Sequence, residues 1–212
     1  MGETMDIVAQ QEVVGVLLAG GLARRMGGGD KCLRRLGDRT ILEHVIQRAQ
    51  PQVAALVLNA NGDATRFERF RLPVVADVLD GFAGPLAGVL TGMAWARQHR
   101  PECPWIVTFA TDTPFFPRNL VARLCDAVQG ADMACAGSAG RPNPVFGLWP
   151  VRLEEDLRRA VVDEQIRKVD VWTARYDIAT VDFPADPIDP FFNTNRPEDL
   201  AEAERLLSLV ER

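Results

Sequence analysis

Glycines and cations alternate in the stretch from Val13 to Lys31, VVGVLLAGGLARRMGGGDK. After the apolar run Val13–Leu18, five glycines fall within ten residues, at Gly20, Gly21, Gly27, Gly28 and Gly29. A backbone without Cβ atoms approaches a ligand closely, and its N–H groups converge on an anion. Arg24, Arg25 and Lys31 would neutralise a polyphosphate. The stretch predicts a phosphate-binding loop. The alternative interpretation is a flexible surface loop with incidental arginines.

Two common nucleotide-binding loops are excluded. The dinucleotide fingerprint G-x-G-x-x-G does not occur here, and Lys31 is followed by Cys32 instead of the Ser or Thr of a P-loop. A phosphate loop of another kind is therefore expected.

Asp112 closely follows the apolar run Trp105–Ala110, which predicts a buried strand. In open α/β sheets, ligands bind beyond the carboxyl ends of the strands, so this carboxylate is expected beside the phosphate loop. There it would hold Mg²⁺ through oxygen ligands. The alternative is that Asp112 caps the turn that contains Pro114.

Asn59 and Asp77 end two further expected strands. An amide and a carboxylate can read the N–H and carbonyl edge of guanine. Asn and Asp are also common turn formers, so a purely structural role is the alternative.

The elements that position these residues alternate along the chain. Thr40 and Glu43 form a capping box, and a helix that ends before Pro51 should follow. Turn-rich Gly137–Asn143 should separate two strands, and Arg167–Tyr176 is ambiguous. Strands are expected at Val13–Leu18, Val53–Leu58, Leu72–Ala76, Trp105–Ala110, Ala131–Ala136, Val145–Trp149 and Ile178–Phe183. Helices are expected after Gly88, after Pro117, over Leu153–Val161 and near the C-terminus.

This alternation predicts a three-layer α/β/α sandwich around a mainly parallel sheet. We expect one domain over residues 1–212, with residues 1–12 as a loose N-terminal extension. The net charge of −5 argues against a nucleic-acid footprint. No membrane-spanning run or signal peptide is evident, which favours a cytoplasmic protein. Cys32, Cys103, Cys125 and Cys135 form no C-x-x-C pair and are expected to be reduced thiols.

Leu18 to Lys31, L-A-G-G-x-A-R-R-M-G-G-x-D-K, resembles the signature of the nucleotidyltransferases that guanylylate the molybdenum cofactor, the MobA family. The related L-A-A-G-x-S-x-R-M-G loop belongs to cytidylyl- and sugar-phosphate nucleotidyltransferases. The resemblance implies the Rossmann-like fold of nucleotide-diphospho-sugar transferases. The second glycine of L-A-G-G favours guanine among these relatives.

The resemblance also implies residue roles. Asp112 matches the aspartate of a C-D-x-P segment, although Thr111 replaces the cysteine, and Gly84–Gly88 matches G-P-L-A-G. Asn193 and Asn195 match a late N-x-N element on the acceptor side, where a helix-start turn is the alternative; Arg196 replaces its threonine. GTP-binding positions map to Leu18, Ala19, Gly20, Lys31, Asn59, Asp77 and Asp112.

The implied reaction transfers GMP from GTP to the terminal phosphate of the molybdenum–molybdopterin cofactor and releases pyrophosphate. Lys31, Asp112 and Arg25 would be catalytic, with Mg²⁺ on Asp112, although Arg25 could equally pack against the sheet. The alternatives are a CTP-using molybdopterin cytidylyltransferase, a sugar-phosphate nucleotidyltransferase, and a non-catalytic GTP-binding carrier of the cofactor. A monomer is expected, with transient contacts to molybdoenzymes or their chaperones.

Overall fold

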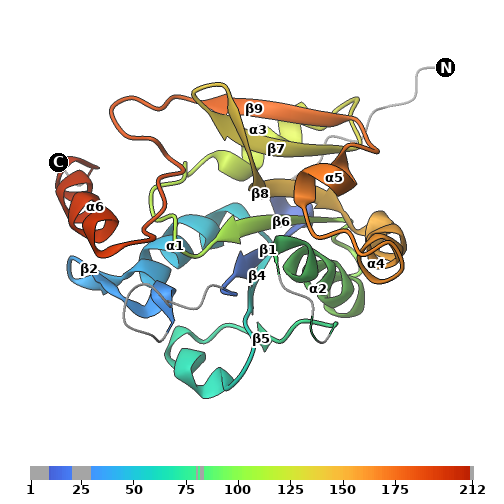
Figure 1. Ribbon diagram of the computed structural model, residues 1–212, viewed down its shortest axis with the longest axis horizontal. Coiled ribbons are helices and arrows are strands. Elements are labelled where there is room, and N and C mark those ends of the chain that lie inside the picture. Colours follow the sequence, from blue (N-terminus) through green and yellow to red (C-terminus); the bar gives the residue numbers. More distant parts are fainter. Residues whose placement is uncertain (1–9, 21–29, 80, 82–83, 211–212) are drawn as a thin grey trace.

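The computed structural model describes residues 10–20, 30–79, 81 and 84–210 (Figure 1). Its centre is a seven-stranded sheet in the order β5-β4-β1-β6-β8-β7-β9. The strands are β1 (Val13–Leu18), β4 (Ala55–Asn59), β5 (Val74–Val75), β6 (Trp105–Ala110), β7 (Met133–Ser138), β8 (Arg141–Pro150) and β9 (Ile178–Phe183). A separate small hairpin joins β2 (Arg35–Leu36) to β3 (Arg39–Thr40).

Helices cover both faces of this sheet. The α-helices are α1 (Ile41–Ala49), α2 (Pro85–His99), α3 (Leu120–Ala127), α4 (Glu154–Val162), α5 (Val169–Thr173) and α6 (Pro197–Val210). Short 3₁₀ helices are η1 (Gln10–Glu12), η2 (Lys31–Leu33), η3 (Gln50–Gln52), η4 (Ala64–Phe70) and η5 (Val151–Leu153). Within the described ranges, no helix is both long and apolar enough to cross a membrane.

Strand β1 shows why two cores form. Val13 and Leu17 join a core with residues of α1 and α3, whereas Val14 and Val16 join a second core with residues of α2, α4 and α5. Successive side chains of a strand point to opposite faces, so an entirely apolar β1 serves both layers. Figure 1 shows α2, α4 and α5 grouped together. This arrangement confirms the predicted three-layer sandwich.

The sheet is mainly parallel, as predicted. β1 pairs in parallel with β4 and β6, β4 with β5, and β7 with β9, whereas β8 runs antiparallel to both its neighbours. The chain adds β4 and β5 on one side of β1 and then returns to add β6 on the other. Such a reversal opens a crevice at the carboxyl ends of the strands. The register places Leu18 beside both Asn59 and Ala110 at that edge.

The capping box before α1 is confirmed. The Thr40 hydroxyl accepts from the Glu43 N–H, while the Glu43 carboxylate accepts from the Thr40 N–H at 2.6 Å. This backbone hydrogen bond lowers the pKa of Glu43. The two reciprocal bonds fix the point at which the helix begins.

Two predictions about strands and turns need changing. The prediction that Gly137–Asn143 separates two strands was wrong, because only Ala139 and Gly140, both with positive φ, separate β7 from β8. Pairing of Gly137 with Pro142 and of Ser138 with Arg141 overrides the local turn preference. Pro142 and Pro144 are tolerated in β8 because β6 pairs with β8 only from Leu148 onward. The ambiguous segment contains the short helix α5, and the expected strand at Leu72–Ala76 shrinks to the two residues of β5.

Candidate functional site

A cavity of about 490 Å³ opens at the carboxyl ends of β1, β4 and β6. The predicted site residues that line it are Leu18, Gly20, Lys31, Asn59, Asp77, Asp112, Asn193 and Asn195. Ala19 is buried and its N–H donates to the Asn59 carbonyl at 2.9 Å, so this amide is already paired. Arg25, with Arg24 and most of the glycine-rich loop, lies outside the described residues.

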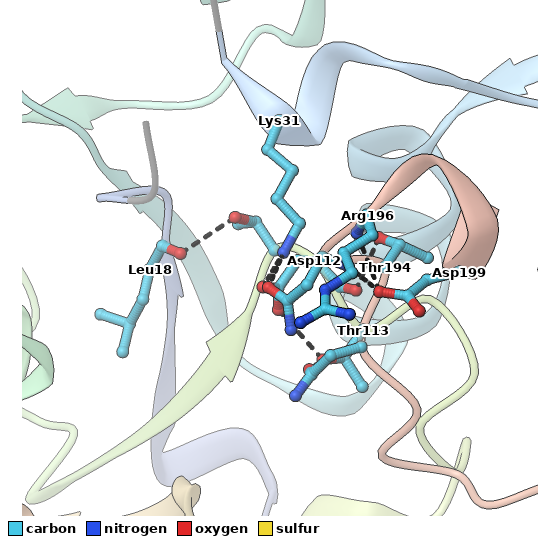
Figure 2. A network of polar contacts seen from close by, with 10 residues as sticks. Leu18, Lys31, Asp112, Thr113, Thr194, Arg196 and Asp199 are labelled. Atoms are coloured by element: carbon cyan, nitrogen blue, oxygen red, sulfur yellow. Dashed lines mark hydrogen bonds and ion pairs between the residues drawn. The ribbon is translucent and has the colours of Figure 1, made fainter. Parts of the chain in front are cut away.

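At one end of the cavity, Lys31 lies between two oxygen acceptors. Its Nζ donates to Asp112 Oδ2 and to Asn195 Oδ1, both at 2.5 Å. The Lys31 side chain is 10% exposed and that of Asp112 is 29% exposed. Figure 2 shows the lysine reaching from η2 toward Asp112, which follows β6. A buried ammonium needs such partners, because desolvating an unpaired charge is costly.

The segment before α6 holds Asp112 in place. Thr194 is fully buried, and both its N–H and its hydroxyl donate to the Asp112 carbonyl, at 2.9 and 3.0 Å. The Thr113 hydroxyl donates to Asn193 Oδ1 at 2.5 Å. These bonds tie the turn after β6 to a segment about 80 residues later (Figure 2). Asn193 and Asn195 therefore both contact the Lys31–Asp112 end of the cavity.

The start of α6 keeps one half of a capping box, although Arg196 offers no hydroxyl. Asp199 Oδ2 accepts from the N–H groups of Asn195 and Arg196, each at 2.8 Å. Asp199, in the first turn, thus supplies the carboxylate half of a capping box, whereas a threonine hydroxyl at position 196 would have accepted from N–H groups inside the first turn. Arg196 itself is exposed.

At another part of the cavity wall, two amides hold one carboxylate. Asn59 Nδ2 donates to Asp77 Oδ1 at 2.9 Å, and Asn61 Nδ2 donates to Asp77 Oδ2 at 2.7 Å. The sequence analysis gives Asn61 no role of its own, although an amide two residues beyond Asn59, at the same strand end, was the signal that could have suggested one. Gly88 leaves room here, since a Cβ on it would lie 2.7 Å from Asn59 Oδ1.

Thr111 and Cys32 also line the cavity. The Thr111 hydroxyl donates to the Leu18 carbonyl at 2.9 Å and so joins the ends of β1 and β6, a role that the sequence did not indicate (Figure 2). Burial raises the pKa of the Cys32 thiol to about 12, and the nearby Asp30 adds to the rise. The Cys32 thiol is therefore protonated at neutral pH, so Cys32 lines the cavity without acting as a nucleophile.

The residues present fit a magnesium ion that is shared with a substrate. Within the described part of the chain, no three His, Cys, Asp or Glu side chains gather as a metal site. Mg²⁺ is commonly held by one or two carboxylates together with substrate phosphates and water. Asp112, with the amide oxygen of Asn195 nearby, is a donor set of this hard-oxygen type.

Comparison with known proteins identifies relatives of the chain. One is the molybdenum cofactor guanylyltransferase of Bradyrhizobium sp. (strain ORS 278), 58% identical over 202 residues, which are 94% of this chain and 95% of the relative. Another is the enzyme of the same name from Rhodopseudomonas palustris (strain BisB5), 58% identical over 193 residues, 90% of this chain and 92% of the relative.

Solved structures share the fold. Molybdopterin-guanine dinucleotide biosynthesis protein A from Archaeoglobus fulgidus has a TM-score of 0.71 at 23% identity, covering 92% of this chain and 99% of that one. A CMP:2-keto-3-deoxy-manno-octonic acid synthetase complexed with CTP has a TM-score of 0.72 at 12% identity, covering 93% and 99%. The fold is thus the Rossmann-like α/β fold of nucleotide-diphospho-sugar transferases.

A family profile described as the MobA-like NTP transferase domain matches residues 15–177. This range holds most of β1 with Lys31, Asn59, Asp77 and Asp112, whereas Asn193 and Asn195 come from the segment after it. The chain therefore belongs to the MobA-like NTP transferase family.

Proposed function

We propose that the chain transfers GMP from GTP to the terminal phosphate of the molybdenum–molybdopterin cofactor and releases pyrophosphate. The observation that carries this proposal is that one cavity holds both a lysine–carboxylate pair, Lys31 with Asp112, and an amide-held carboxylate, Asp77. The first suits a triphosphate and the second suits a purine with N–H donors. Relatives of the same name that match over nine-tenths of the chain support the same choice.

In this proposal the base lies toward Asn59 and Asp77. Guanine offers N–H donors that an ionised carboxylate accepts, because a carboxylate has acceptor sites only. Gly88 and the neighbouring backbone of Gly84 and Pro85 line the same wall and leave space for the nucleoside.

The triphosphate lies toward Lys31 and the backbone around Leu18, Ala19 and Gly20. Phosphate oxygens replace Asp112 and Asn195 as acceptors for the Lys31 ammonium, which then offsets charge that develops on the leaving pyrophosphate. Arg25 is proposed to assist from the glycine-rich loop.

Asp112 and the amide oxygen of Asn195 are the groups proposed to hold Mg²⁺. Such an ion would supply neutralisation of the phosphate charge. Thr194 keeps the Asp112 backbone in place for this role, and Lys31 prevents its carboxylate from turning away before the nucleotide arrives.

The acceptor is proposed to lie beside Asn193 and Asn195. Each side-chain amide carries N–H donors suited to a phosphate. A terminal phosphate oxygen of the cofactor attacks the α-phosphorus, the new P–O bond forms, and the bond from the α-phosphorus to the bridging oxygen breaks. Transfer of this kind depends on alignment and charge stabilisation, so no protein nucleophile is needed.

The test is pyrophosphate release by the purified chain with molybdopterin-bound molybdenum and Mg²⁺, with GTP, CTP and ATP compared. We expect turnover with GTP alone, loss on removal of divalent metal with EDTA, and loss in Asp112→Ala. Asp126→Ala is the matched control, because Asp126 is an exposed residue of α3.

Other outcomes decide between the alternatives. A preference for CTP would keep the chemistry and overturn the guanine assignment. Nucleotide binding without turnover would instead support a carrier of the cofactor.

A further inference from the structure

We propose that Asn61 is a positioning residue that sets base selectivity, by fixing the Asp77 carboxylate as an acceptor of two adjacent N–H donors. This inference rests on the proposed function, since it concerns how the same cavity distinguishes guanine from other bases. It goes further in assigning the selectivity to a side chain that need not touch the base.

The side chain of Asn61 forms hydrogen bonds with Asp77 through both its amide nitrogen and its amide oxygen. Asn61 Nδ2 donates to Asp77 Oδ2 at 2.7 Å, and Asn61 Oδ1 accepts from the Asp77 backbone N–H at 2.8 Å. The backbone N–H can be satisfied only by the amide oxygen, so the amide nitrogen must face the carboxylate. The network itself therefore fixes the orientation of the Asn61 amide.

A second amide completes the restraint on Asp77. Asn59 Nδ2 donates to the other carboxylate oxygen, Oδ1, at 2.9 Å and also to the Val75 carbonyl at 3.3 Å. With one donor on each oxygen, the carboxylate cannot rotate about its Cβ–Cγ bond without breaking both hydrogen bonds. Asn59 is buried, but Asn61 is exposed and needs support of its own.

Arg66 supplies that support. Its Nη2 donates to the Asn61 carbonyl at 2.6 Å, its Nε donates to Asp30 Oδ2 at 2.5 Å, and its Nη1 donates to the Asp63 carbonyl. The guanidinium also lies 4.5 Å from the centre of the Phe67 ring. The backbone of Asn61 is thus held to η4 and to Asp30, the residue before Lys31. The position from which the Asn61 side chain extends is therefore fixed.

The held carboxylate matches one base edge better than others. An ionised carboxylate has about four lone-pair sites, so each Asp77 oxygen keeps one after the amides are bound. Guanine presents N1–H and the exocyclic N2–H₂ side by side, and one hydrogen bond to each oxygen results. Hypoxanthine lacks the amino group. Cytosine places the N3 lone pair beside its amino group, so N3 would oppose a carboxylate oxygen.

The experiment compares GTP with ITP, whose base is hypoxanthine, in wild type, Asn61→Ala and Asn61→Asp. Asn61→Ala should lower kcat/KM for GTP by about tenfold to a hundredfold, mainly through KM, since one hydrogen bond to a charged group is lost. ITP should lose less, so the GTP:ITP ratio should fall. Asn119→Ala is the matched control, because Asn119 is exposed and its side chain makes no capping bond to α3.

Asn61→Asp separates positioning from simple support of the backbone. The new carboxylate still accepts from the Asp77 N–H but cannot donate to Asp77 Oδ2. Selectivity should therefore fall at least as far as in Asn61→Ala. A GTP:ITP ratio like that of the wild type in either variant would overturn the proposal, as would a wild-type preference for CTP.

Measuring the equilibrium binding of GTP and ITP to the same proteins tests the role of Asn61 independently of the proposed reaction. If the wild type turns over no nucleotide, the proposed reaction fails. The ratio of the two dissociation constants then decides the role of Asn61, with a smaller ratio in both variants as the supporting result.

Discussion

At the scale of single residues, the paired Lys31 ammonium is the most consequential feature of the cavity. Two oxygen acceptors at 2.5 Å offset the cost of burying it, and both line the cavity in which we propose the triphosphate to bind. Asp112 is partly exposed, so it can take up water or a cation when the lysine leaves it. The pair is therefore suited to exchange partners and is not a permanently buried structural bridge.

Removing the Lys31 ammonium should impair activity far more than folding. Lys31→Ala should lower kcat/KM for GTP by about a hundredfold to a thousandfold, as expected when one donor to developing charge is deleted. Thermal unfolding should change little, because the remaining Asp112 carboxylate reaches solvent. Steady-state kinetics and calorimetry check both parts, with the exposed Lys168→Ala as control. A large fall in melting temperature with unchanged kinetics would make the pair structural instead.

At the scale of elements, the close approach of α2 to β1 shapes the wall around Asn59. A Cβ on Gly88 would lie 2.5 Å from Leu18 Cδ2 and 2.7 Å from Asn59 Oδ1. One turn later, a Cβ on Gly92 would lie 2.5 Å from Val16 Cγ2. Both glycines permit the same packing, but only the first contacts a residue of the candidate site.

Alanine at these two positions should separate stability from binding. Each change should destabilise the fold by about 1–3 kcal/mol through overpacking, offset in part by about 1 kcal/mol of better helix propensity. Gly88→Ala should also raise KM for GTP, since Asn59 must move and it holds Asp77. Gly92→Ala should leave KM unchanged. Urea unfolding and kinetics on both variants check this, and an equal rise in KM would contradict it.

The helices and strands also show how much of the fold the sequence patterns predict. β1 and β6 begin and end where the apolar runs predict, because a buried strand needs a mainly apolar stretch. β9 also has its predicted bounds, although it is a half-exposed edge strand. The start of β8 was missed, because its pairing with β7 overrides the turn signals of Pro142 and Asn143. The same limit applies to Asn61 and Thr111, whose partners Asp77 and Leu18 are distant in sequence and meet only at the sheet edge.

At the scale of the whole molecule, buried thiols make stability depend on pH. Cys32, Cys103, Cys125 and Cys135 are all free and buried. Burial raises the pKa of Cys32 and of Cys125 from 9.0 to about 12, with smaller contributions from Asp30 and Asp126 respectively. Both thiols stay protonated in the folded chain at a pH at which they would ionise in the unfolded chain.

The folded state should therefore lose stability in alkaline solution. For a group whose pKa is raised on folding, the stabilisation is complete below the unfolded value, here 9.0, and is lost as pH rises from there toward 12. The loss is at most about 1.4 kcal/mol per pH unit for each thiol. Urea unfolding between about pH 8 and pH 10 should show this slope in the wild type. The double variant Cys32→Ala/Cys125→Ala should show a flatter one, whatever its absolute stability, because the other titrating groups are common to both proteins. Equal slopes would mean that the two thiols ionise alike in the folded and unfolded chains.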